Sequence, residues 1–205
     1  MCIKIGHKTV YITFSFAAFF ALISNIAGGK KLLLTFLFSL LHEMIHIAYL
    51  HYSGLKETEI ILLPAGVKIY CQGFSVLSYK KIFICSLSAP VFNIVAGVVF
   101  FFISSIKKNA DAFLCGEINL ILGIVNLLPM KFLDGGRATD AILKSRYEEK
   151  ESTYIMNVLS VISLIMLFFL FFAGCIAGKL SFPLLVFCVY CFIGNFSDVF
   201  RKKNL

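Results

Sequence analysis

Two histidines four residues apart are the side chains of this sequence best suited to chemistry. His42 and His46 enclose the motif His-Glu-Met-Ile-His. On an α-helix, residues i and i+4 share one face, so both imidazoles can bind a single metal ion. Glu43 lies beside them, where a general base would be needed. The motif therefore predicts a helix that carries a metal-dependent hydrolytic site.

The segments on both sides of this motif are strongly apolar. LLLTFLFSL precedes it and IAYL follows it. Ionisable side chains inside a membrane span are energetically costly, and for that reason they usually mark a functional site. We expect His42, Glu43 and His46 to lie within a transmembrane helix.

The composition predicts a membrane protein that crosses the bilayer several times. Hydrophobic residues make up 60% of the 205 residues, charged residues only 15%, and the mean hydropathy is +0.91. Such values lie outside the range of soluble domains. We expect a single all-α membrane domain over residues 1–205. Its six transmembrane helices are predicted at residues 10–28, 32–52, 82–106, 112–128, 154–176 and 180–196. The first is expected to be a retained span rather than a cleaved signal peptide.

The distribution of basic residues predicts the orientation in the membrane. With these spans, 14 of the 19 Lys and Arg residues fall on the side of the two termini. The positive-inside rule then places both termini in the cytoplasm, in a multi-pass protein of the cell membrane. The net charge of +8 would face anionic lipids, and nothing in the sequence supports nucleic-acid binding.

Residues 59–74, EIILLPAGVKIYCQGF, do not fit the series of helices. The segment is too short to span a membrane, is rich in Ile, Val and Tyr, and has a turn signal at its centre. We predict a short membrane-associated β-hairpin between the second and third helices, with an ordinary loop as the alternative. An extended substrate could pair with its edge, so Ile60, Val67 and Ile69 are candidate substrate-binding residues.

A second chemical motif, NLLPMKFLDGGR, spans residues 126–137. Pro129 cannot continue a helix, so we expect the fourth helix to break there and to leave Asp134 on irregular backbone. Helices two and four run in the same direction, which brings His42, His46 and Asp134 toward the cytoplasmic half. Asp134 could complete a His₂Asp metal site. The alternative is a plain turn after a helix.

These motifs together resemble the site-2 protease family of intramembrane zinc metalloproteases. The likeness is greatest to the compact six-span group typified by stage IV sporulation protein FB. It depends on HEMIH, NLLPMKFLDGGR, the hairpin, and the sequence SAPVFN that ends at Asn93. The resemblance implies that His42, His46 and Asp134 bind one zinc ion and that Glu43 is the catalytic base.

The resemblance also places Asn126 near the substrate, where it could donate to the developing oxyanion. Asn93 matches a further family position, which we assign to substrate binding. A membrane-associated protein is the implied substrate, a pro-sigma factor in the sporulation-like subgroup, and a regulatory membrane protein is a possible partner. We find no CBS or PDZ segment in the 205 residues and expect no nucleotide regulation through such a domain.

Two other functions share part of this pattern. A zinc or iron transporter can carry HExxH in a membrane helix, but it would need a second set of ligands on a neighbouring span. A 2-His-1-carboxylate iron oxygenase would explain the ligands but would leave Glu43 and the NLLP break without a role. Glu117 is expected to snorkel or to form an ion pair. Cys188 and Cys191, a CxxC pair, are expected to be buried small hydrophobic residues.

Overall fold

The computed structural model describes residues 2–5, 8–12, 29–55, 58–63, 66–71, 77–177, 185, 187–189 and 191–194. The chain divides into two compact units, Met1–Asn126 and Leu127–Leu205, which we treat separately. Most of the first and sixth predicted helices, including residues 13–28, lies outside the described residues.

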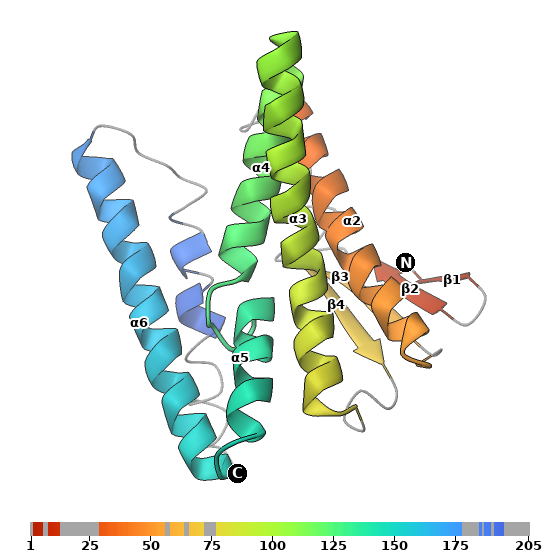
Figure 1. Cartoon of the computed structure of the whole chain (residues 1–205), viewed down its shortest axis with the longest axis vertical. Coiled ribbons are helices and arrows are strands. Elements are labelled where there is room, and N and C mark those ends of the chain that lie inside the picture. The colour runs from red at the N-terminus through yellow and green to blue at the C-terminus, as the bar shows by residue number, and fades with distance from the viewer. Residues whose placement is uncertain are drawn as a thin grey trace. The chain divides into compact units, whose positions relative to one another are not determined.

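Three helices form the frame of the first unit (Figure 1). They are α2 (Gly29–Tyr52), α3 (Tyr79–Lys107) and α4 (Ala110–Asn126), each in contact with the other two. Helices α3 and α4 approach closely because glycines face the contact. A β-carbon added at Gly123 would lie 2.7 Å from Ile94 Cγ1 and 2.9 Å from the Pro90 carbonyl oxygen. Because Gly123 has no side chain, α3 and α4 can approach closely enough for their polar side chains to meet.

The three helices coincide closely with the predicted segments 32–52, 82–106 and 112–128. They begin two or three residues earlier than predicted, and α4 also stops at Asn126, two residues earlier than predicted. Residues 127–133 then form turns and irregular backbone. This is the break expected from Pro129, which has no N–H to donate to the helix and restricts the residue before it.

Four strands form one sheet in the first unit. They are β1 (Cys2–Ile5), β2 (Lys8–Ile12), β3 (Thr58–Leu63) and β4 (Gly66–Cys71), in the order β1-β2-β3-β4. β3 and β4 pair antiparallel with Leu63 opposite Gly66, and β2 pairs with β3 in parallel. Among the described strands β4 therefore occupies one edge, and it contacts α2.

The sheet corrects the prediction of an all-α fold in two respects. The pair β3–β4, which falls on the segment where we predicted a hairpin, belongs to a larger sheet instead of standing alone. Residues 10–12 lie in β2 and not at the start of the first helix. The sequence KTVYI is rich in β-branched and aromatic residues, and pairing with β3 outweighs the apolar run that suggested a helix.

Helices α2, α3 and α6 (Glu149–Ile176) are each long and apolar enough to cross a membrane. Helix α4 has 17 residues. Large apolar side chains are exposed along α3, among them Val98, Phe102 and Ile106, each more than half exposed. Such side chains are unfavourable in water and suit a lipid environment. The described helices are therefore those of a membrane protein.

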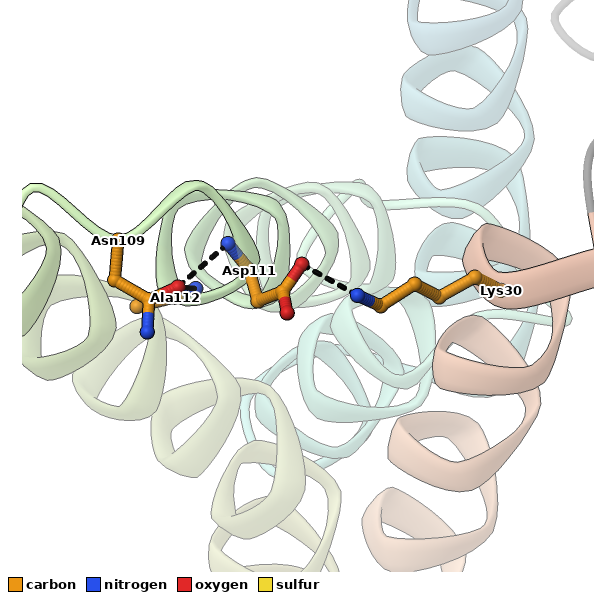
Figure 2. Close-up of polar contacts among 4 residues, drawn as sticks. All are labelled: Lys30, Asn109, Asp111 and Ala112. Carbon is orange, nitrogen blue, oxygen red and sulfur yellow. Dashed lines mark hydrogen bonds and ion pairs between the residues drawn. The ribbon is translucent and has the colours of Figure 1, made fainter.

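Ion pairs join the first turns of α2 to α4. Lys30 Nζ lies 2.5 Å from Asp111 Oδ1 (Figure 2), and Lys31 Nζ lies 3.7 Å from Glu117 Oε2. The Asn109 side-chain oxygen accepts from the backbone N–H of Asp111 at 2.8 Å and caps α4. Glu117 is thus paired, as the sequence predicted.

The second unit is built on α5 (Asp134–Lys144) and α6, which pack together. Its hydrophobic core combines buried side chains that precede α5 in the sequence with others that lie in α6 or after it. They are Met130, Leu133, Leu164, Leu167, Phe171, Cys188 and Cys191. Both cysteines are fully buried in this core, in agreement with the prediction. Helix α6 begins at Glu149, five residues earlier than predicted.

Helix α5 corrects the expectation that Asp134 lies on irregular backbone. Asp134 is the first residue of this helix, where a negative charge interacts favourably with the unpaired backbone N–H groups. The two following glycines lie against the preceding turn. A β-carbon at Gly135 would collide with the backbone of Leu127, and one at Gly136 with that of Met130. Residues 127–130 therefore occupy the space that two side chains would need.

We predict that Gly136→Ala destabilises the protein by at least about 2 kcal/mol, because the new methyl group meets backbone atoms that cannot rotate away. Unfolding of the purified protein in detergent would measure this. Gly29→Ala is the matched control, since no described atom lies within 4 Å of its β-carbon position. Equal unfolding midpoints for the two variants would contradict the close backbone contact.

Candidate metal centre

The HEMIH motif lies in α2, as predicted, and both imidazoles are buried. His42 is 4% exposed and His46 6%. Their ring centroids are 5.0 Å apart with an interplanar angle of 83°. The one-turn spacing on the helix thus brings the two rings together in the first unit.

Helix α3 fixes the orientation of His46. Its Nδ1 lies 3.0 Å from the backbone carbonyl oxygen of Cys85. A carbonyl oxygen can only accept, so Nδ1 must carry the proton. The ring lone pair is then on Nε2, the nitrogen that can bind a metal.

His42 is oriented by a chain of side-chain amides. Its Nδ1 lies 2.8 Å from Asn93 Oδ1, and Asn93 Nδ2 donates to Asn119 Oδ1 at 3.0 Å. Asn119 Nδ2 in turn donates to the carbonyl oxygen of Cys115 at 2.9 Å. Asn93 and Asn119 are at most 1% exposed. The three helices α2, α3 and α4 thus meet in one buried polar network.

Asn119 and the carbonyl of Cys85 were not identified from the sequence. A backbone carbonyl leaves no signal in the residue types. Asn119 did leave one: it is an amide side chain within an apolar segment, where a polar group needs a partner. The sequence does not say which partner it finds.

Three further residues of the first unit were predicted to belong to the site: Glu43, Asn93 and Asn126. Glu43 is half-buried on α2, next to His42. Asn93 contacts His42, which gives it a role in orienting that imidazole ring, while its contact with substrate stays a prediction. Asn126 ends α4 and donates to the carbonyl oxygen of Leu122 at 3.0 Å, so its role as an oxyanion donor also stays a prediction.

The predicted substrate-binding residues of the hairpin lie in its two strands. Ile60 in β3 is opposite Ile69 in β4, and Val67 is opposite Leu62. Asp134 belongs to the second unit, where it is buried, and Arg137 Nη1 lies 3.8 Å from its Oδ1. Its role as a ligand is taken up below as a proposal.

The donor chemistry of the two histidines fits a zinc ion. Imidazole nitrogen is a common zinc ligand, and ligating histidines usually donate the N–H of their other ring nitrogen to a carbonyl or carboxylate. Both imidazoles here follow this pattern, through a backbone carbonyl at His46 and an amide oxygen at His42. The residues present are therefore those of a zinc site.

Three comparisons connect the chain with known proteins. Residues 110–170 match peptidase family M50. A zinc metalloprotease of Methanocaldococcus jannaschii is 29% identical over 137 residues, which cover 64% of this chain and 40% of that protein. The solved structure of a site-2 protease from Methanocaldococcus jannaschii shares the fold, with a TM-score of 0.65, 21% identity, and coverage of 95% of this chain and 93% of that one.

The family match does not depend on the HEMIH motif. The matched residues 110–170 begin in α4 and end in α6, and they contain Asn126 and Asp134 but neither histidine. Two separate parts of the sequence thus indicate the same family, and the resemblance to the site-2 proteases is confirmed. The chain spans about two-fifths of the length of the curated relative.

Proposed function

We propose that this chain, which carries a segment of the site-2 protease family M50, is an intramembrane zinc metalloendopeptidase. It would hydrolyse a peptide bond in or near a membrane segment of a regulatory protein, close to the cytoplasmic face. The observation that carries the proposal is the pair of buried imidazoles on an apolar helix, each with Nδ1 held by a hydrogen-bond acceptor. Two histidines that only filled space between helices would not both need a hydrogen-bond acceptor at Nδ1.

We assign His42, His46 and Asp134 as the three protein ligands. All three are buried, and each offers one ligand atom of a type that zinc binds. When bound, zinc polarises a scissile carbonyl and lowers the pKa of a bound water to roughly 7. Asp134 is the one charged ligand in this set, and Gly135 and Gly136 fix its backbone within the second unit.

Glu43 would move the proton. Its carboxylate follows His42 directly in the helix and is only half-buried, so it can accept a proton from the attacking water and return it to the leaving amine. Asn126 would donate its amide to the developing oxyanion, a contact typically worth about 3 kcal/mol. To do so, it must exchange its bond to the Leu122 carbonyl for one to the substrate.

The substrate must be extended before a water can attack its backbone. A transmembrane helix that unwinds exposes backbone groups, and these need new partners in an apolar environment. Strand β4 offers such partners, because it occupies an edge of the described sheet and contacts α2, the helix of HEMIH. We propose that an unwound substrate segment pairs with β4.

The six-span topology with both termini in the cytoplasm is part of the same proposal. It is supported by the bias in basic residues and by three apolar helices that are long enough to span a bilayer. Membrane-associated proteins with a segment near the cytoplasmic surface would be the substrates, a pro-sigma factor among them, and a membrane protein could regulate access.

Glu43→Gln tests the division of roles within HEMIH. We expect it to lower proteolysis by at least about 100-fold while the zinc content stays near one per chain, because Glu43 handles protons and holds no metal. His42→Ala and His46→Ala should lose both zinc and activity. Metal analysis of the purified protein, with cleavage of a membrane-anchored substrate, measures the two quantities.

Retention of most of the proteolytic rate by Glu43→Gln would contradict the mechanism. Zinc that stays bound in both histidine variants would contradict the ligand assignment. A protein that binds zinc and transports it across vesicles without cleaving any peptide would instead be a transporter.

Asp134→Asn tests the third ligand. It keeps the shape of the side chain but removes its charge, so we expect zinc affinity to fall by at least about 10-fold and activity with it. Asp140→Asn is the matched control on the same helix, since Asp140 forms a half-exposed ion pair with Lys144 at 2.7 Å. Equal zinc affinities for the two variants would mean that Asp134 begins helix α5 but does not bind zinc.

Proline in β4 tests the presentation of the substrate. Val67→Pro or Ile69→Pro removes a backbone N–H and distorts the strand, so cleavage should fall at unchanged zinc content. Ile3→Pro in β1, the opposite edge of the described sheet, is the control. If it impairs cleavage equally, the β4 edge has no special role, and products cut on the external side would overturn the proposed location.

A further inference from the structure

We infer that Asn119 is a positioning residue for the metal centre: acting through Asn93, it sets which ring nitrogen of His42 carries the proton. This inference deepens the proposed function and rests on the assignment of His42 as a zinc ligand. It follows from the direction of three hydrogen bonds that link α4 to α2 by way of α3.

The direction is set at the end of the network, in α4. Asn119 contacts the carbonyl oxygen of Cys115, which lies four residues earlier in the same helix. An amide side chain has one accepting oxygen and one donating NH₂ group. Because the backbone carbonyl can only accept, the NH₂ group of Asn119 must face it. The oxygen of Asn119 is then the atom directed at Asn93.

The same reasoning passes the direction on to His42. Asn93 must present its NH₂ group to the Asn119 oxygen, at 3.0 Å. Its own oxygen therefore faces His42 Nδ1, at 2.8 Å. That oxygen also only accepts, so Nδ1 must be the protonated nitrogen and the lone pair lies on Nε2. A fixed helix carbonyl in α4 thus determines the tautomer of a histidine in α2.

Without Asn119 the direction is no longer determined. An amide can rotate by about 180° with little change in shape, and Asn93 would then present NH₂ to His42. Nδ1 would have to accept, Nε2 would carry the proton, and a nitrogen with a proton cannot bind a metal. The tautomer of His46 does not depend on an amide that can rotate, because its Nδ1 faces the backbone carbonyl of Cys85 directly.

Burial makes this dependence strong. Asn119 is completely buried and Asn93 is 1% exposed. Water cannot replace a missing partner there at small cost, so removal of the Asn119 oxygen leaves an unsatisfied NH₂ group on Asn93. Rotation of Asn93 toward the wrong orientation is one way to relieve that loss.

The test compares two substitutions of similar size in the full-length protein in detergent. Asn119→Leu removes the acceptor for Asn93. Asn119→Asp keeps it: a buried, protonated carboxyl group donates to the Cys115 carbonyl and accepts from Asn93, as the amide does. Cys115→Ala is the control, since it changes the side chain and leaves the carbonyl in place.

Two measurements are needed. Chelator competition gives the zinc affinity, which we expect to fall about 10- to 100-fold in N119L and to stay within about threefold of wild type in N119D and C115A. The ¹⁵N chemical shifts of the His42 ring in the zinc-free protein report the tautomer directly. We expect protonation at Nδ1 in wild type and N119D, and a substantial Nε2-protonated fraction in N119L.

The outcomes separate the inference from the proposed function. Zinc affinities and tautomers in N119L equal to those of wild type would overturn the inference, and so would a loss in N119D as large as that in N119L. If N119L does not fold, Asn119→Ala answers the same question with a smaller side chain. Failure of the wild-type protein to bind zinc would count against the proposed function, whereas the tautomers of the zinc-free protein would still decide the role of Asn119.

Discussion

The position of a proton on two imidazole rings is the constraint on which this site depends. In water a neutral histidine exchanges between its two tautomers, and solvent accepts whichever proton is presented. A buried ring has no such freedom, so the protein must supply an acceptor to each Nδ1. It does so with the Cys85 carbonyl for His46 and with the Asn93 oxygen for His42. The rest of the first unit brings those acceptors into place.

Close packing of α3 and α4 is what makes these contacts possible. Glycines where the two helices meet, among them Gly97, Gly116 and Gly123, allow the backbones to approach. Amide side chains from the two helices can then reach each other, and Asn93 can reach α2. Small residues at helix contacts are the usual way for membrane helices to pack, since lipid gives no hydrophobic force that drives helices together. The same glycines thus serve stability and the chemistry of the site.

The sequence predicted those features that are written in local patterns. HEMIH and its apolar flanks located the helix of the site, and Pro129 located the end of α4 to within two residues. Features that depend on distant pairing were missed. Residues 10–12 are a strand because they pair with β3, about fifty residues later, and α5 is a helix although Gly135 and Gly136 argue against one. Asn119 has a partner that only the packing of α3 and α4 reveals.

The contact of Gly135 and Gly136 with the turn at residues 127–130 has a consequence for how this segment can vary. The start of α5 is placed by backbone against backbone, with no rotatable side chain between. Exchange of side chains in the loop therefore leaves this backbone contact in place, although Met130 and Leu133 also belong to the hydrophobic core of the second unit. The number of residues between this turn and the Asp134 carboxylate has no such freedom. An insertion or deletion of a single residue would shift that carboxylate by a whole backbone step, and no change of rotamer could restore it.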